Sequence, residues 1–301
     1  MIKQILVPLD GSQAAEAVLP YVERIATAAN ASVLLLAAVD RPRDWGEDTG
    51  GDLKGEREAA ESYLLRLQGR LTSATGKDVE LQVVESEPAA TILATSEKQQ
   101  PDLIAMTTHG RSGLARWVLG SVLAKLLHAT HTPILIVRPP ADNTEREGGG
   151  ITKILVPLDG SDASASVLPF AADLAKSLGA RMSLFHALAE VAMLYPGPEA
   201  IFDSNVQKEM VAGARKYLTS TAEGLSEQGV EANSTATFGN TVDGIVWTAE
   251  RENADLIVMS THGRSGIGRV VLGSVADAVV RRTSLPVILV TPATNSGHAD
   301  G

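Results

Sequence analysis

The 301-residue chain contains no cysteine, which excludes a disulfide framework, a thiolate zinc site and a cysteine nucleophile. Aromatic residues make up only 4% of it, which argues against stacking platforms for single-stranded nucleic acid. The 26 basic residues are outnumbered by 36 acidic ones, so the formal charge is −10. A basic excess would be expected of a protein that binds nucleic acid or an anionic membrane. The composition therefore predicts neither partner.

Long apolar runs are also missing, since none approaches the roughly 18–20 residues that a membrane-spanning helix needs. The opening MIKQILVPLDGS reaches an acidic turn after one short apolar run and shows no signal-peptide pattern. What the chain does have is 44% hydrophobic and 21% charged residues, a balance typical of globular proteins. We therefore expect a cytoplasmic protein, with two domains at about 150 residues per domain.

The chain repeats itself. Residues 5–12 and 154–161 both read ILVPLDGS, and residues 108–113 and 261–266 both read THGRSG. A period near 150 residues is far longer than the roughly 20–50 residues of solenoid repeats. Between the copies, a polar segment opens with two prolines and closes with three glycines, as linkers do. The sequence therefore predicts a duplicated domain, with copies at residues 1–147 and 148–301.

Each copy alternates short apolar runs with segments of helical periodicity. Runs that are apolar at every position are typical of strands buried on both faces of a parallel sheet, and intervening helices make βαβ units. The predicted fold class is α/β, with two tandem doubly wound, mostly parallel five-stranded sheets flanked by helices. The strands are expected at residues 4–8, 32–39, 79–84, 102–107 and 133–138, then at residues 154–157, 181–186, 231–237, 255–260 and 286–291.

Helices are expected in the first copy at residues 56–74, 89–98 and 122–130. An earlier one should begin after Ser12, a residue type that caps helix N-termini well. Pro20 falls inside this earlier helix, and Pro169 has the same register in the second copy. We expect a tolerated kink at each proline.

Ligands of doubly wound sheets bind beyond the carboxyl ends of the strands, where the strand order reverses, and the repeated motifs follow the first and fourth strands. After the fourth strand, Gly110 would let an anion approach the backbone, with positive charge from Arg111 and Arg116. Gly120 and Ser121 open a helix, where unpaired N–H groups favour a phosphate. The alternative is that these glycines serve only a tight turn and close packing. The second copy repeats the pattern with Gly263, Arg264, Arg269, Gly273 and Ser274.

Asp10 ends the first strand of the first copy, and Asp159 ends that of the second. Each is expected to face the crevice of its own copy, the one that the phosphate loop borders. A carboxylate there can accept a hydrogen bond from an adenine amino group or a ribose hydroxyl, but Asp-Gly-Ser suits a turn and a helix cap equally well. His109 and His262 suggest a catalytic base, yet no nucleophile is evident, so a loop histidine bonded to backbone is favoured. HExxH, GxxxxGK[ST] and GxGxxG patterns are absent. The sequence therefore predicts no catalytic residue and no metal site of the protein's own.

The motifs VPLDGS, THGRSG and LGSV, with a final apolar strand that begins at proline, resemble the universal stress protein family over nearly the whole chain, twice. The resemblance implies a Rossmann-like, adenine nucleotide alpha hydrolase-like fold with ATP, accompanied by Mg²⁺, in each copy. It implies that Asp10 and Asp159 hold the adenine with backbone near Ala38 and Ala187, and that the loop glycines and helix starts hold the phosphates. The other positions carried over from the motif are Met106, Thr107, Val122, Met259, Ser260 and Val275.

The first position of the phosphate motif departs from the ATP-binding branch of that family. In that branch the motif is a glycine, a second glycine after two residues, and a Gly-Ser or Gly-Thr pair after nine more. The second part is present in both copies, but Thr107 and Ser260 replace the first glycine. A side chain there would either crowd the nucleotide or place a hydroxyl beside it. The copies also differ from each other near the crevice, where Pro88 of the first corresponds to Thr241 of the second.

These observations predict a stress protein that binds ATP as a regulatory or structural ligand, since no base or nucleophile is evident. The alternatives are a slow ATPase or adenylating enzyme, and a nucleotide-free scaffold for a partner protein. Family members commonly dimerise through their last strands. The resemblance therefore implies that residues 133–138 and 286–291 pair within the chain, with a homodimer as a further possibility.

Overall fold

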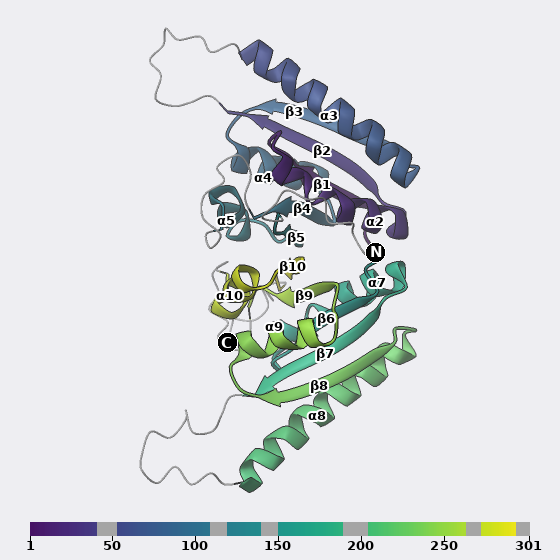
Figure 1. Ribbon diagram of the computed structural model, residues 1–301, viewed down its shortest axis with the longest axis vertical. Helices are drawn as coiled ribbons and strands as arrows, with labels where there is room; N and C mark the ends of the chain where they lie inside the picture. The colour runs from purple at the N-terminus through teal and green to yellow at the C-terminus, as the bar shows by residue number, and fades with distance from the viewer. Residues whose placement is uncertain (41–52, 109–118, 140–149, 189–203, 263–271, 293–301) are drawn as a thin grey trace, which may run out of the picture. The chain divides into compact units, whose positions relative to one another are not determined.

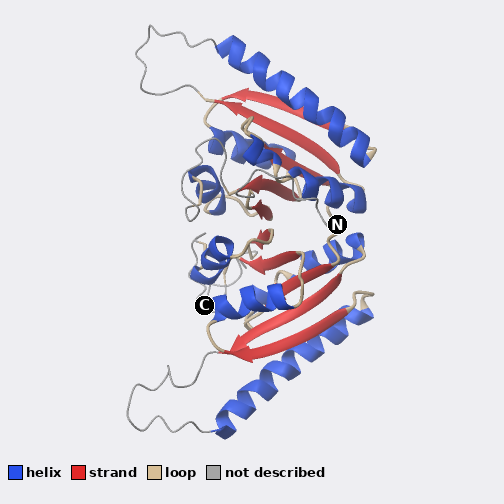
Figure 2. Ribbon diagram, viewed as in Figure 1, coloured by secondary structure: helices blue, strands red, loops and turns tan. Residues whose placement is uncertain are grey.

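A computed structural model of the chain describes residues 1–40, 53–108, 119–139, 150–188, 204–262 and 272–292. The chain forms two compact units, Met1–Gly150 and Ile151–Gly301. In each unit a parallel sheet is flanked by helices (Figure 1 and Figure 2). The fold class predicted from the sequence is confirmed.

The first unit alternates strands and helices along its length. Its strands are β1 (Gln4–Pro8), β2 (Ser32–Val39), β3 (Val79–Glu85), β4 (Leu103–Thr107) and β5 (Ile134–Val137). Its helices are α1 (Gln13–Glu16), α2 (Leu19–Ala29), α3 (Leu53–Thr75), α4 (Pro88–Gln99) and α5 (Ser121–Leu127). The strands lie in the order β3-β2-β1-β4-β5, and every pairing is parallel.

The second unit repeats this arrangement. Its strands are β6 (Lys153–Pro157), β7 (Arg181–Leu188), β8 (Ala232–Phe238), β9 (Leu256–Ser260) and β10 (Val287–Val290). Its helices are α6 (Asp162–Ala165), α7 (Leu168–Leu178), α8 (Ser204–Glu227), α9 (Thr241–Arg251) and α10 (Ser274–Arg282). The strand order β8-β7-β6-β9-β10 matches that of the first unit, and all pairings are again parallel.

The apolar runs form strands because helices cover both faces of each sheet, which leaves no polar side to the strand. Ile5, Leu6 and Val7 of β1 are fully buried, as are their counterparts in β6. All ten strands expected from the sequence are present, with ends that differ by two residues at most, and β7 extends to Leu188 rather than stopping at residue 186.

The predicted kink at Pro20 is wrong, because the helix is broken there. Helix α1 ends at Glu16, and α2 begins afresh at Leu19, so that Pro20 lies in its first turn. Proline is best accommodated in a first turn, where its missing N–H would have no intrahelical acceptor anyway. Pro169 has the same place in α7. The predicted cap is confirmed, since the Ser12 side chain accepts a hydrogen bond from the Ala15 amide.

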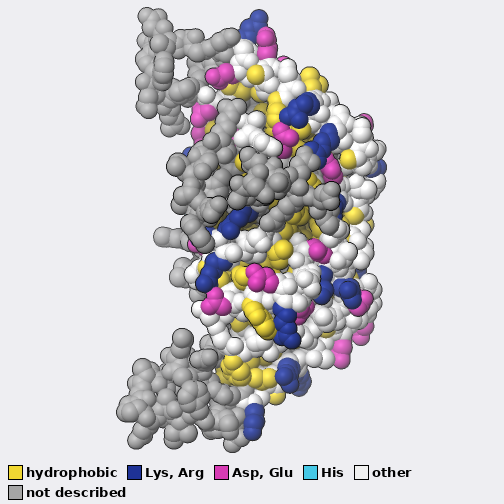
Figure 3. Space-filling model, viewed as in Figure 1, with side chains coloured by type: hydrophobic (Ala, Val, Ile, Leu, Met, Phe, Trp, Pro, Cys, Tyr) yellow, Lys and Arg dark blue, Asp and Glu magenta, His cyan; other side chains and the backbone are white. Residues whose placement is uncertain are grey.

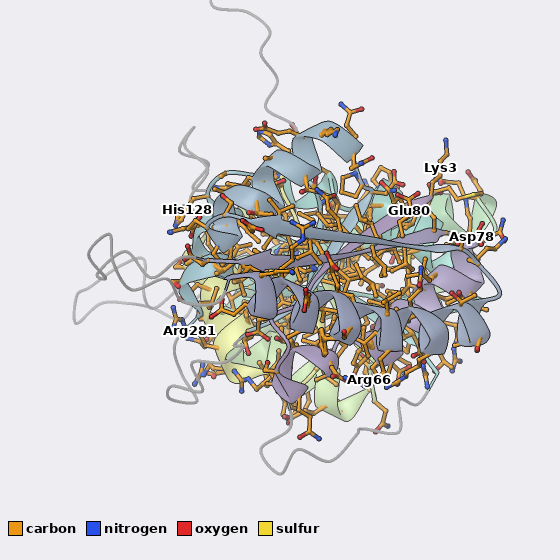
Figure 4. The ribbon with its side chains drawn as sticks, turned by 90° about the horizontal axis from the view of Figure 1, so that it is seen from above. Lys3, Arg66, Asp78, Glu80, His128 and Arg281 are labelled. Atoms are coloured by element: carbon orange, nitrogen blue, oxygen red, sulfur yellow. The ribbon has the colours of Figure 1, made fainter. Side chains whose placement is uncertain are left out.

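The order of the strands places a topological switch point between β1 and β4. At the amino ends of these strands, the Asp102 carboxylate accepts hydrogen bonds from the amides of Lys3 and Gln4, at 2.7 and 3.1 Å. Figure 4 shows Lys3 and Asp78, which precede β1 and β3, at one side of the unit and His128, which follows α5, at the other. The carboxyl ends of the strands therefore share one edge, where β1 and β4 diverge to different neighbours.

Charges of both signs are interspersed on the face of the molecule drawn in Figure 3. In the described ranges, no helix combines the length and the apolar character needed to cross a bilayer.

Candidate functional site

A cleft of about 660 Å³ opens at the carboxyl ends of β1, β2 and β4 in the first unit. Its position at the switch point is where doubly wound sheets bind ligands, and its size falls within the roughly 300–1,000 Å³ of small-molecule sites. It is lined by all the described residues of the first copy that the sequence singled out, namely Asp10, Ala38, Met106, Thr107, Gly120, Ser121 and Val122.

The second unit has a cleft of about 340 Å³ in the equivalent place. Its lining again includes the described candidates of that copy, which are Asp159, Ala187, Met259, Ser260, His262, Gly273, Ser274 and Val275. The remaining candidates lie outside the described residues: His109, Gly110, Arg111, Arg116, Gly263, Arg264 and Arg269.

The aspartate after the first strand is held by a tight turn. Asp10 Oδ1 accepts hydrogen bonds from the Ser12 amide at 3.0 Å and from the Ser12 hydroxyl at 2.6 Å. Gly11 between them has a φ of 82°, which glycine adopts without strain. Asp159 Oδ1 and Ser161 repeat both bonds in the second unit. The carboxylate therefore does act as a turn-former, as one interpretation of the sequence held, and this fixes its position at the cleft.

Gly120 has a packing role that weakens its assignment as a phosphate ligand. Its N–H donates to the Thr108 carbonyl at 3.0 Å, and a Cβ added to it would lie 2.8 Å from that oxygen. Gly273 donates to the Thr261 carbonyl at 2.8 Å, and its Cβ would lie 2.7 Å away. Both amides are therefore already used, and glycine is needed because the chain approaches the end of the fourth strand so closely.

The donors that face the first cleft come from the residues after Gly120. Helix α5 begins at Ser121, and the Gly120 carbonyl accepts the Ala124 amide at 3.0 Å. The first N–H groups of a helix have no intrahelical acceptor, so the amides of Ser121 and Val122 are available for an anion. Both residues line the cleft, as Ser274 and Val275 do in the second unit.

The residues that replace the first glycine of the family motif leave the first cleft open. Thr107 is the last residue of β4, lines the cleft and is 7% exposed. Ser260, the last residue of β9, is 6% exposed. A volume of about 660 Å³ remains beside Thr107, so its side chain borders the first cleft without filling it.

His262 is bonded differently from the sequence-based expectation of a backbone partner. Its Nδ1 lies 2.9 Å from the hydroxyl of the preceding Thr261, and its Nε2 is buried without a hydrogen-bond partner. Thr261 is only 3% exposed, so its hydroxyl is not accessible as a nucleophile. The pair therefore gives no support to base catalysis at this cleft.

Sequence reasoning missed two tyrosines, one in each unit, of which Tyr63 lines a cleft. Tyr63 of α3 lines the first cleft, and its hydroxyl is buried without a hydrogen-bond partner. Burial, reinforced by the charges of Glu16 and Asp10, raises the pKa of Tyr63 above its usual value, so the hydroxyl stays protonated. Tyr217 of α8 also has a buried, unpartnered hydroxyl and a raised pKa, caused first by burial and then by Asp159. Their matching positions in the two copies were the available signal.

An ion pair joins the two helices at the border of the first cleft. Lys125 of α5 lies 2.9 Å from Glu87 Oε1, and Glu87 Oε2 caps α4 by accepting the Ala90 amide at 2.7 Å. The bond from Lys125 and then the Ala90 amide hold the pKa of Glu87 below its usual value. In the second unit, Arg282 of α10 lies 2.6 Å from Asp243 of α9. In each unit, an ion pair thus links the helix that begins at the cleft to the helix that precedes it in the chain.

Comparison with known proteins identifies the family of the chain. A universal stress protein of Mycobacterium tuberculosis (strain ATCC 25618 / H37Rv) is 26% identical over 265 residues, 86% of this chain and 84% of its own. One from Methanocaldococcus jannaschii is 34% identical over 140 residues, 46% of this chain and 81% of its own. The crystal structure of a universal stress protein from Archaeoglobus fulgidus DSM 4304 has the same fold, with a TM-score of 0.71 at 22% identity, and covers 96% of this chain and 98% of that one. The model of the universal stress protein family matches residues 1–138 and again residues 150–291. The chain therefore belongs to the universal stress protein family, as two tandem copies.

Proposed function

We propose that this protein binds ATP in the clefts at the carboxyl edges of its sheets, as a regulatory or structural ligand in the stress response. The observation that carries the proposal is the first cleft. About 660 Å³ of space at the switch point is bordered on one side by a fixed carboxylate, Asp10, and on another by the amino end of α5. These two groups suit the opposite ends of a nucleotide, because a carboxylate accepts from an adenine amino group and helix N–H groups donate to phosphate.

Different residues of the first unit would bind the adenine and the phosphates of the ligand. The Leu9 amide donates to the Leu36 carbonyl at 2.8 Å, which continues the β1–β2 pairing and brings Asp10 beside the end of β2, where Ala38 lies. This corner would hold the adenine, with the Tyr63 hydroxyl as a further donor. The amides of Ser121 and Val122 would hold the phosphates, since that of Gly120 is already bonded.

Mg²⁺ would enter with the triphosphate rather than bind the protein alone. Among the described residues, no group of three or more His, Asp or Glu side chains could hold a metal ion. Mg²⁺ in nucleotide sites is commonly bound through substrate phosphates and one or two carboxylates, and Asp10 is a carboxylate that lines the first cleft.

A ligand role is favoured over catalysis by the side chains of the two clefts. General base catalysis needs a base within hydrogen-bond reach of a reachable nucleophile. Within the described ranges, the histidines that line a cleft are His262, whose bonded neighbour Thr261 is buried, and His186, which is itself only 5% exposed. A slow ATPase or adenylating enzyme is therefore the second candidate.

The direct test is to purify the chain, denature it and identify the released nucleotides by chromatography. Calorimetry then titrates ATP with Mg²⁺ onto the stripped protein. Retained nucleotide, or saturable binding below millimolar ATP, is expected. No nucleotide and no binding up to millimolar ATP would contradict the proposal and favour a nucleotide-free scaffold. Sustained release of phosphate or pyrophosphate would favour the enzyme instead.

The proposal also includes a cytoplasmic location, without a nucleic-acid partner, and association through the last strands, within one chain or between two. Light scattering of the purified chain measures its mass and so distinguishes a monomer from a homodimer.

A further inference from the structure

The two clefts differ in size although they occupy equivalent places. The first measures about 660 Å³ and the second about 340 Å³. Both are lined by an aspartate after the first strand and by the start of the helix that follows the fourth strand. We therefore compare the other described lining residues of the two clefts.

The second strand of each unit carries the clearest substitution. Pro8 of β1 pairs with Leu36 of β2, and the equivalent Pro157 of β6 pairs with Phe185 of β7. The next residue is Ala37 in the first unit and His186 in the second. All four line their clefts, and Phe185 and His186 are 1% and 5% exposed. A leucine and an alanine of the first cleft are thus replaced by two buried rings in the second.

The neighbouring helix leaves room for the Phe185 ring. A Cβ added at Gly244 of α9 would lie 2.9 Å from Phe185 Cζ, so the ring packs against helix backbone where a side chain would otherwise stand. Thr91 holds the equivalent place in α4, where it is buried and its hydroxyl donates to the Glu87 carbonyl at 2.9 Å. Phe185 thus packs against Gly244 in the second unit, whereas Leu36 and Thr91 hold the equivalent places in the first.

We propose that Phe185 and His186 are specificity-determining residues that weaken the binding of an adenine nucleotide in the second cleft, so that the chain binds ATP mainly in its first unit. The inference rests on the proposed function. The two rings directly precede Ala187, whose counterpart Ala38 borders the corner assigned to adenine in the first unit. The second cleft keeps its aspartate and its helix start, but has about half the volume of the first.

Calorimetry of the full chain with ATP and Mg²⁺ tests the inference through its stoichiometry. One equivalent is expected, with any second site at least ten times weaker. Two variants then exchange the residues at these three equivalent positions between the two units. Phe185→Leu, His186→Ala and Gly244→Thr together should create a second equivalent. Leu36→Phe, Ala37→His and Thr91→Gly together should weaken the first at least tenfold. Thermal unfolding of each variant without ligand confirms that it is folded.

Each outcome decides between the two proposals. Two equivalents of similar affinity in the unaltered chain would overturn this inference and leave ATP binding intact. A folded Phe185 variant without a second equivalent, or a folded Leu36 variant with undiminished affinity, would overturn it as well. If the first of these variants does not fold, the second decides alone. No binding to the unaltered chain would overturn the proposed function, and this inference with it.

Discussion

Gly120→Ala tests whether this glycine is required by the close approach of two chain segments. The new Cβ would lie 2.8 Å from the Thr108 carbonyl oxygen, whereas ordinary contacts begin at 3.4 Å. The oxygen belongs to backbone, so the strain cannot be relieved by turning a side chain. The loop has to move, which also disturbs the 3.0 Å hydrogen bond from the Gly120 amide to the same oxygen.

The size of the effect follows from these two changes. Overpacking a tight site costs about 1–3 kcal/mol, and weakening a hydrogen bond costs about 0.5–1.5 kcal/mol. Replacing glycine restricts the unfolded chain, which returns about 0.4–1 kcal/mol. We expect a net loss of about 1–3 kcal/mol in the free energy of unfolding. At roughly 2–4 °C per kcal/mol for a domain of this size, the Tm of the first unit falls by about 2–12 °C.

Differential scanning calorimetry is the suitable assay, because a chain of two units need not unfold in a single transition. Gly69→Ala is the matched control, since Gly69 lies within α3 and an added Cβ would meet nothing within 4 Å. This control should gain about 0.5–1 kcal/mol from helix propensity. ATP affinity should fall with Gly120→Ala and stay unchanged with Gly69→Ala. If both variants raise the Tm alike, the argument from close approach is refuted.

Three further predictions follow from the same contacts. Gly273→Ala should lower the Tm of the second unit by a similar amount, since its Cβ would lie 2.7 Å from the Thr261 carbonyl, and should leave ATP binding in the first cleft unchanged in calorimetry. Tyr63→Phe removes a buried, unpartnered hydroxyl, so it should raise the stability of the free protein by about 1 kcal/mol in urea unfolding, yet weaken ATP binding. Glu87→Gln should cost about 0.5–1 kcal/mol at pH 7, because it weakens a partly exposed ion pair and a helix cap. The pKa of Glu87 in the folded protein lies below its usual 4.5. The stability that the ionised Glu87 contributes is therefore fully present above pH 4.5 and is lost as the pH falls through the lowered pKa. Chemical unfolding at a series of pH values measures this loss.

Each of these has its own control and its own contradicting result. Gly213→Ala in α8, where an added Cβ meets nothing within 4 Å, should not destabilise the second unit as Gly273→Ala does. Equal ATP affinity of Tyr63→Phe and the unaltered chain would remove that hydroxyl from the site. Glu58→Gln, whose pair with Lys54 is exposed and 3.9 Å long, should change stability by no more than about 0.5 kcal/mol. A cost of Glu87→Gln that persists in acid would show that the effect is not electrostatic.

The amino-acid sequence by itself determined the duplication, the fold class and the places of all ten strands. Strands buried on both faces must be apolar at every position, so β1 and β6 stand out as continuous runs between turn residues. The candidates that the sequence singled out and that the structure describes do line the clefts, because the carboxyl ends of parallel strands share one edge. The prolines were interpreted less well, since spacing alone does not say whether Pro20 kinks a helix or begins one.

Tertiary structure alone decided how the residues of each cleft are used. That the Gly120 amide is already bonded to Thr108, that Tyr63 reaches the first cleft from α3, and that Phe185 packs on Gly244 all depend on segments far apart in the chain. Local pattern carries no information on such contacts, because strand order and the packing of helices on the sheet bring these segments together. The unequal volumes of the two clefts are likewise a property of the folded units that no single motif predicts.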